Sequence, residues 1–195
     1  MKRLLLILIL TLSFQSLIKA DDIRDFQIEG MSIGDSALNF YSKSEIEANT
    51  WDYYKDKKFT PVQLSNFSFY ETYDAVDFDF KTDDNEYIIY SLSGIIKYKD
   101  KNIENCYAKM DKIDEDLSKV LDGFKREDKA TWKNEIDPTG KSTFTDIYYE
   151  SADGTITLTC YDFSKELEKK GTRDYLSLMI SLNEWNTFMR SNPYN

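Results

Sequence analysis

The sequence has no histidine among its 195 residues, and this absence excludes several kinds of active site. A Ser-His-Asp triad or a Cys-His pair needs an imidazole as general base. Zinc sites built on imidazole ligands are excluded for the same reason. Catalysis would have to use carboxylate, Tyr, Lys or Ser-Lys chemistry, and no spacing of such residues stands out. We expect no cofactor and no resident metal ion, and the balance of these observations is against an enzyme.

Flexible and low-complexity material is also scarce. The chain has 7 glycines and 3 prolines, while 41% of its residues are hydrophobic and 15% aromatic. Such a composition is ample for a core, so disorder is not expected despite the high charge. After the first twenty residues, the length suits one compact domain, residues 21–195, with two closely packed halves at about 21–100 and 101–195.

Long apolar runs are missing except near the start. Two basic residues open the chain, and an apolar stretch from Leu4 to Ile18 follows that is too short to span a bilayer. Ala20 then precedes two aspartates, as a small residue at a cleavage point should. The pattern predicts a secretory signal peptide, residues 1–20, cut after Ala20. The alternative is a retained membrane anchor, because Ile18 is unusual three residues before a cut.

Export would make the protein strongly acidic. Without residues 1–20 the chain keeps 22 basic against 35 acidic residues, a net charge of −13. This charge repels phosphate backbones and anionic headgroups, so nucleic acid is excluded as a partner, and cationic proteins or divalent cations are favoured. No cysteine follows the apolar stretch, as a lipid anchor would need. We expect a periplasmic or extracellular protein without stable membrane insertion after cleavage, whose partner is another exported or envelope protein.

Hydrophobic periodicity in the first half predicts mostly strands. A short strand is expected at about 26–30, a helix at about 35–47 and an edge strand around Phe59. Three further strands follow, at 67–73, 76–80 and 88–98. In the second of these, Asp77 and Asp79 alternate with core phenylalanines and are expected to face water.

The second half has a similar order. The clearest helix spans 103–124, an irregular segment follows at 125–141, and strands are expected at about 143–150, 155–163 and 174–182. Asp153 and Gly154 form a hairpin signal, and Trp185, Phe188 and Met189 indicate a terminal helix. Neighbouring strands after a helix predict an α+β fold, an antiparallel sheet packed by helices. The order would fit a tandem of two helix-then-three-strand units.

The two cysteines are both placed to face the core. Cys106 lies on the apolar stripe of the predicted helix, and Cys160 lies on the inward face of its strand. In an oxidising compartment two such cysteines favour a disulfide, which would close a loop of about 55 residues and contribute roughly 4 kcal/mol. The alternative is two buried thiols that never meet.

Acidic residues are dense between Asp77 and Glu86. The segment holds six oxygen-bearing side chains: Asp77, Asp79, Asp83, Asp84, Asn85 and Glu86. Such side chains bind Ca²⁺ when they converge at a turn. The register is not that of a calcium-binding loop, so a solvated surface is the favoured interpretation.

Tyrosine is abundant, with 14 residues, and five of them lie on predicted strands. Tyr combines apolar area with a polar tip, so an exposed row would suit binding. The candidate interaction face consists of Tyr87, Tyr148, Tyr149, Tyr161 and Tyr175. The alternative is that these aromatic residues belong to the core.

One short segment carries a family resemblance. The segment from Gly30 to Ser36 (GMSIGDS), followed by Leu38 and Phe40 in the predicted helix, resembles the opening of small exported modules of the beta-lactamase-inhibitor-like and BamE (SmpA)-type group. The resemblance covers about a dozen residues. It implies a helix-plus-antiparallel-sheet unit that binds other proteins.

The leading functional hypothesis is therefore an exported, non-enzymatic binding or interaction module. A carboxylate-based hydrolase acting on carbohydrate is one alternative, and it requires a cleft that holds two carboxylates within about 10 Å. Sequence spacing cannot select that pair among 35 acidic residues. The other alternative is a structural envelope protein without a specific ligand.

Overall fold

A computed structural model describes residues 22–98, 102–191 and 193–194. The predicted signal peptide lies outside these residues. No helix in the described ranges is both long enough and apolar enough to cross a membrane.

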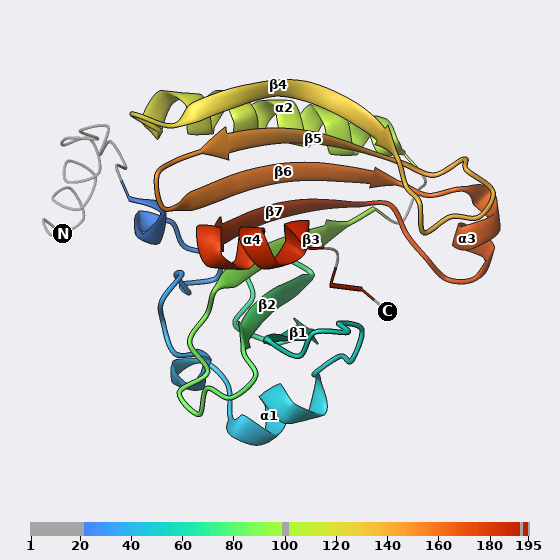
Figure 1. Ribbon diagram of the computed structural model, residues 1–195. Coiled ribbons are helices and arrows are strands. Elements are labelled where there is room, and N and C mark those ends of the chain that lie inside the picture. The colour runs from blue at the N-terminus through green and yellow to red at the C-terminus, as the bar shows by residue number, and fades with distance from the viewer. Residues whose placement is uncertain (1–21, 99–101, 192, 195) are drawn as a thin grey trace, which may run out of the picture.

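The fold is α+β and is built on one seven-stranded antiparallel sheet with the order β1-β2-β3-β7-β6-β5-β4 (Figure 1). The strands are β1 (Phe59–Ser65), β2 (Ala75–Lys81), β3 (Ser91–Lys97), β4 (Lys125–Lys133), β5 (Thr143–Glu150), β6 (Gly154–Asp162) and β7 (Tyr175–Leu182). The two halves of the chain meet where β3 pairs with β7. They contribute three and four strands, so the sheet is continuous across the whole domain.

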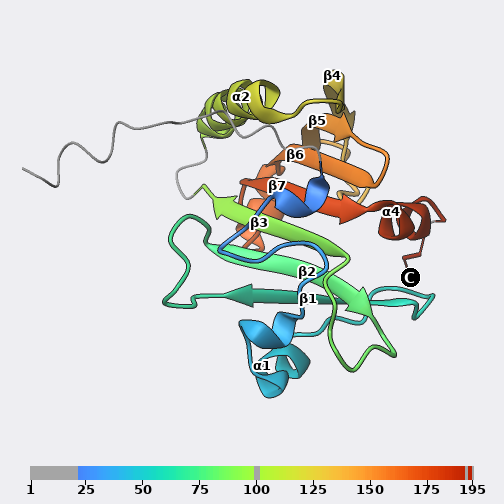
Figure 2. The same cartoon turned by 90° about the vertical axis from the view of Figure 1, so that its left-hand side faces the viewer.

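Four α-helices surround the sheet: α1 (Lys43–Ala48), α2 (Ile103–Val120), α3 (Lys165–Lys169) and α4 (Asn183–Arg190). The two longest lie on opposite faces, with α2 on one side and α4 on the other (Figure 2). These two faces differ in chemistry, and we call them the apolar face and the polar face.

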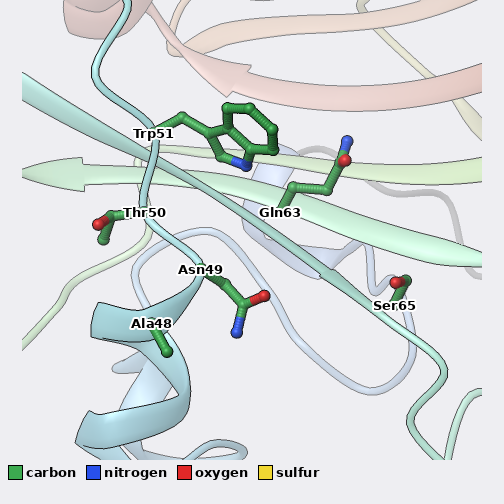
Figure 3. A pocket seen from close by; sticks show the side chains of 6 residues that line it. All are labelled: Ala48, Asn49, Thr50, Trp51, Gln63 and Ser65. Carbon is green, nitrogen blue, oxygen red and sulfur yellow. The ribbon is translucent and has the colours of Figure 1, made fainter.

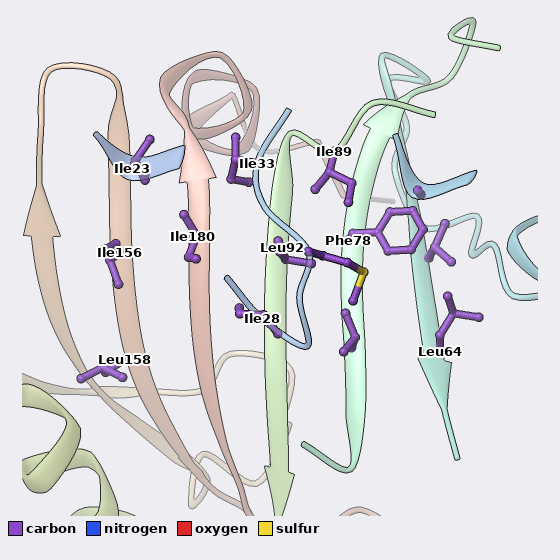
Figure 4. Close-up of a cluster of buried hydrophobic side chains, with 14 of the residues drawn as sticks. Ile23, Ile28, Ile33, Leu64, Phe78, Ile89, Leu92, Ile156, Leu158 and Ile180 are labelled. Carbon is purple, nitrogen blue, oxygen red and sulfur yellow. The ribbon is translucent and has the colours of Figure 1, made fainter. Parts of the chain in front are cut away.

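The apolar face forms most of the core. It receives alternate strand side chains, all buried: Val62, Leu64, Val76, Phe78, Leu92, Ile156, Leu158, Leu176 and Ile180. Helix α2 packs on this face at β6 and β7. The segment before α1 adds Ile23, Ile28 and Ile33 to the same core (Figure 4). Removal of this apolar area from water is the main stabilising contribution to the fold.

The polar face carries the other set of alternate side chains. From β2 to β6 these include Ile95, Lys97 and Met179 as well as Asp77, Asp79, Ser91, Ser93, Ser177, Ser181, Thr155, Thr157, Thr159, Tyr161 and Tyr175. Helix α4 lies across part of this face and is held by Asn186, which accepts from Ser181 at 2.7 Å and donates to Thr155 at 3.2 Å. Trp185 and Phe188 pack beside these bonds in a second, smaller cluster. The polar face is therefore covered in part.

The predicted helix at 35–47 is wrong in its extent. A 3₁₀ turn, Ala37–Asn39, comes first, and α1 begins only after it. Ser42 and Glu45 form a reciprocal capping box that fixes the start of α1. The predicted strand at 26–30 is likewise replaced by a tight reversal, in which Ile28 and Met31 exchange backbone hydrogen bonds of 2.9 and 3.0 Å.

The predicted strand at 67–73 is also wrong. Glu29, 42 to 44 residues away, accepts hydrogen bonds of 2.8–2.9 Å from the backbone N–H groups of residues 71–73. Those donors are no longer free for a strand ladder. The ring of Tyr73 instead lies on Gly94, where a Cβ would come within 2.5 Å of it. Long-range contacts thus override the local alternation of aromatic residues.

Strand β4 occupies a segment that was expected to be irregular. Its side chains are mostly charged and exposed, so it lacks the apolar alternation of a half-buried strand. Pairing with β5 holds it in place, and two ion pairs tie it to α2, between Arg126 and Asp114 at 2.9 Å and between Lys129 and Asp111 at 2.7 Å. Charged residues on such an edge strand also oppose edge-to-edge aggregation.

Cys106 of α2 and Cys160 of β6 are joined in a disulfide across the apolar face, with a Cα–Cα distance of 6.0 Å. Both residues are fully buried. The bond links a helix and a strand that are 54 residues apart in sequence. It therefore restricts the unfolded chain over a long loop.

We predict that the double variant Cys106→Ala/Cys160→Ala loses about 2–4 kcal/mol of unfolding free energy, because the loop constraint on the unfolded chain is removed. Urea unfolding at neutral pH measures the loss. Wild-type protein unfolded in the presence of a thiol reductant should show a similar shift. Equal unfolding free energies for the oxidised wild type and the double variant would contradict the prediction.

Candidate functional site

A groove on the polar face is the best candidate for a functional site. It has a volume of about 340 Å³. Its floor consists of residues from β1, β2, β3, β6 and β7, and its walls come from α4, from the loop before β1 and from the C-terminal end of the chain. We call it the aspartate–tyrosine groove, after the residues used below: Tyr53, Asp77, Asp79, Tyr161, Tyr175 and Trp185.

The two aspartates of the groove were expected to face water, and this expectation is wrong. Asp79 is only 7% exposed, and Asp77 is half-buried. Their alternation with core phenylalanines does place them on the opposite face from the core. That face, however, is covered here by α4 and by the loop that carries Tyr53 and Tyr54. The alternation reports which face a residue occupies and does not report what lies over it.

Asp79 is held at the inner end of the groove. Tyr54 Oη donates to its Oδ1 at 3.0 Å. Burial raises the pKa of Asp79 to about 7, against the opposing effect of hydrogen bonds such as the one from Tyr54. A carboxyl with such a pKa exchanges its proton near neutral pH.

Asp77 has one satisfied and one unsatisfied oxygen. Gln63 Nε2 on β1 donates to Oδ2 at 3.1 Å, whereas Oδ1 is buried and has no hydrogen-bond partner within the described part of the chain. Burial raises the pKa of Asp77 to about 6, while the Gln63 hydrogen bond and the more distant Lys97 lower it. A buried acceptor without a partner is costly in a folded protein. The free oxygen of Asp77 is therefore a feature that a ligand could satisfy.

Trp185 of α4 provides an unsatisfied donor in the same groove. Its side chain is 7% exposed, and its Nε1–H makes no hydrogen bond of good geometry among the described residues, although it lies close enough to Asp79 to lower the pKa of that carboxyl. Trp185 also lines a second hollow, of about 290 Å³, on the other side of α4, together with Tyr148 and Thr157. Thr157 Oγ1 is a third buried atom without a partner. Unsatisfied polar atoms thus lie on both sides of α4.

The five candidate tyrosines do not form one exposed row. Tyr161 and Tyr175 are paired neighbours on β6 and β7, stack with ring centroids 4.4 Å apart, and line the aspartate–tyrosine groove. Tyr148 is on the same face but lines the second hollow. Tyr149 is 2% exposed on the apolar side and donates to Asp114 of α2. Tyr87 is buried against Phe80.

The prediction placed Tyr149 and Tyr87 wrongly for local reasons. Tyr148 and Tyr149 are consecutive on β5, so they must point to opposite faces. Tyr87 has a positive φ of 52° in the connection before β3, which takes its side chain out of any strand alternation. Three of the five candidates therefore remain on the polar face.

A third hollow, of about 320 Å³, lies at the β1 edge of the sheet. The side chains of Asn49, Trp51, Gln63 and Ser65 surround it (Figure 3). Trp51 is 55% exposed, and no charged residue lines this hollow. It matters here because its Gln63 is the residue that holds Asp77.

Four groove residues are hard to recognise from the sequence: Tyr53, Tyr54, Trp185 and Tyr194. The available signal was the apolar stripe of the terminal helix, which required a surface to pack on. Within the described ranges, no three Asp, Glu, Cys or His side chains cluster as metal ligands. The acidic stretch from Asp77 to Glu86 is divided, with Asp77 and Asp79 in the groove and Asp83 exposed beyond β2.

Comparison with known proteins gives no match to a family model, to a curated protein or to a solved structure.

We predict that the stability of the protein depends on the buried state of Asp79. Folding raises its pKa from 3.8 to about 7, so the folded state binds more protons than the unfolded state between these values. This carboxyl therefore contributes stability below about pH 4 that is lost as the pH rises through 7. On going from pH 5 to pH 8, Asp79→Asn should gain roughly 1–3 kcal/mol of unfolding free energy relative to wild type.

Urea unfolding of both proteins at pH 5 and pH 8 measures this difference. Asp83→Asn, at an exposed position just beyond the same strand, is the matched control and should follow the wild type at both pH values. A constant difference between Asp79→Asn and wild type across the two pH values would show that Asp79 titrates normally.

Proposed function

We propose that the protein is an exported, non-enzymatic binding module that takes part of a protein partner into the aspartate–tyrosine groove. The observation that carries the proposal is the presence of buried, unsatisfied polar atoms in an aromatic groove, Asp77 Oδ1 and Trp185 Nε1. Aromatic side chains with polar tips are enriched where proteins bind one another. A partner that reached these atoms would remove a cost that the free protein carries.

Several further features support this proposal. The mouth of the groove is accessible, because Tyr53 is 42% exposed. The resemblance of the segment from Gly30 to Ser36 to exported modules that bind proteins agrees with it. The disulfide supports an oxidising compartment, periplasmic or extracellular. The partner would then be another exported or envelope protein.

A carboxylate-based hydrolase acting on carbohydrate is the second candidate, and the same groove supports it. Asp77 and Asp79 are two residues apart on β2, so their Cα atoms are about 6.6–6.8 Å apart and the carboxyls fall within about 10 Å. Raised pKa values suit an acid and a base near neutral pH. Release of nitrophenol from nitrophenyl glycosides by the wild type, and its loss in Asp79→Asn, would favour the hydrolase over the binding module.

The binding proposal predicts position-dependent cross-linking. A photo-reactive benzoylphenylalanine in place of Tyr53, at the mouth of the groove, should form one reproducible covalent adduct with a protein when cells that export the chain are irradiated. The adduct is detected by immunoblotting and identified by mass spectrometry.

Trp132 provides the matched control position. It is also an exposed aromatic residue, at 54%, but it lies on the edge strand β4, away from the groove. The same photo-reactive residue at 132 should give no such adduct. Equal adducts from both positions, or none from position 53, would overturn the proposal, and the second result would favour a structural envelope protein.

A further inference from the structure

We propose that the aspartate–tyrosine groove recognises an alkylammonium group, supplied by a lysine side chain of the partner, with Asp77 as its principal acceptor. The inference rests on the proposed function of the groove and names the chemistry of the group that enters it. It follows from four properties of the groove: its acceptors, its aromatic walls, its charge and its one unsatisfied donor.

The groove contains carboxylate acceptors for an ammonium group. Asp77 Oδ1 is buried without a hydrogen-bond partner, and Asp79 lies two residues further along the same strand. Gln63 and Tyr54 each donate one hydrogen bond to this pair. An ammonium group carries three N–H donors and no acceptor, so it can supply what Asp77 Oδ1 lacks. Hydrogen bonds between charged groups are roughly twice as strong as neutral ones.

The aromatic walls favour an organic cation. Tyr161 and Tyr175 stand together at one end of the groove, Trp185 forms another wall, and Tyr53 lies at the mouth. Aromatic faces attract ammonium groups, and their apolar area suits the methylene stem of a lysine. An anion or a purely apolar group would leave the carboxyls unsatisfied.

The charge of the groove is opposite in sign to that of an ammonium group. Among the described residues that line it, none is Lys or Arg, and two are Asp. Lys97 acts on Asp77 through space only, without an ion pair between them. The chain as a whole has a net charge of −10, which raises the local concentration of cationic partners. Among the residues that the structure describes, no cation therefore forms an ion pair with Asp77.

The unsatisfied indole N–H of Trp185 favours a peptide-borne amine over a free one. A simple alkylamine in its charged form has no acceptor for this donor, whereas a peptide carries a carbonyl oxygen beside each side chain. A lysine in a peptide can therefore satisfy both Asp77 Oδ1 and Trp185 Nε1. The groove volume, about 340 Å³, is within the range of pockets that enclose small ligands.

The indole N–H of Trp185 also allows ligand binding to be measured by NMR. The protein has three tryptophans, and the other two, Trp51 and Trp132, are exposed outside the groove. In ¹⁵N-labelled protein at pH 8, titration with N-acetyl-lysine methylamide should shift the indole N–H signal of Trp185, with a dissociation constant of about millimolar. The signals of Trp51 and Trp132 should not move. N-acetyl-norleucine methylamide, which has the same stem without the charge, should bind at least about tenfold more weakly.

Two variants test the acceptor. Asp77→Asn keeps the size of the side chain and should weaken lysine binding at least about tenfold, whereas Asp83→Asn, on the exposed turn, should not. The pH dependence of lysine binding by the wild type provides a further test that needs no substitution. Between pH 8 and pH 5 the affinity should fall about tenfold or more, because Asp77 takes up a proton in that range.

Several titratable groups interact with Asp77, and their protonation states also bear on the pH dependence of binding. They are Asp79 on β2, Lys97 on β3, Tyr161 on β6, Tyr175 on β7 and Tyr53 in the loop before β1, and Tyr70 acts from the apolar side of the sheet. Asp79 and Asp77 itself have pKa values, about 7 and about 6, that lie between pH 5 and pH 8. Loss of affinity at pH 5 therefore reports on the aspartates.

The outcomes separate the inference from the proposed function. Equal binding of the lysine and norleucine ligands, or full binding by Asp77→Asn, overturns the ammonium proposal, whereas a partner cross-linked from position 53 would leave the proposed function standing. If n-butylammonium binds and the lysine ligand does not, the source is a small amine and the assignment to a partner's lysine is wrong. Lysine binding without any cross-linked partner would support recognition of an ammonium group by the groove and would overturn the proposed function.

Discussion

The two-residue alternation of the seven-stranded sheet is the constraint on which the rest of this structure depends. It sorts every strand residue onto one of two faces with different covers. The apolar face is closed by α2 and by the segment before α1, and it forms a continuous core. The polar face is closed only where α4 and the Tyr53–Tyr54 loop lie on it. The candidate site is a consequence of that incomplete cover.

Partial cover has a defined electrostatic effect. Asp77 and Asp79 are too buried to be well hydrated, and among the described residues neither forms an ion pair with a cation, although Lys97 lowers the pKa of Asp77 from a distance. The free protein therefore retains a destabilising feature of the kind that is common where function demands it. Stability is supplied elsewhere, by the apolar core and by the Cys106–Cys160 disulfide between α2 and β6. The same sheet thus provides the stable core and the strained site.

The local sequence pattern was sufficient to predict the helices and strands that bury one apolar face in the core. Helix α2 and strands β2, β3, β5, β6 and β7 lie close to their predicted ranges, because their apolar periodicity is decided by the core they face. Strand β4 was missed because its partners are charges on α2 and the backbone of β5. The segment at 67–73 was mistaken for a strand because the carboxylate that binds it, Glu29, is distant in sequence.

The site was harder to predict than the sheet. Alternation placed Asp77 and Asp79 opposite the core, but the burial of that face is decided by α4, about a hundred residues later. Alternation does assign Tyr149 to the core side of β5, opposite Tyr148, but it could not show that Tyr87 lies outside any strand and is also buried in the core. Residues that share a face can be read from a pattern, whereas the element that covers them cannot.

The buried charge of the groove is the central claim, and direct titration of its carboxyls tests it. Carbon-detected NMR of the Asp77 and Asp79 side chains between pH 3 and pH 9 should give midpoints near 6 and 7, because burial disfavours the ionised forms. Midpoints near 4 for both carboxyls would show that the polar face is hydrated and would contradict the account.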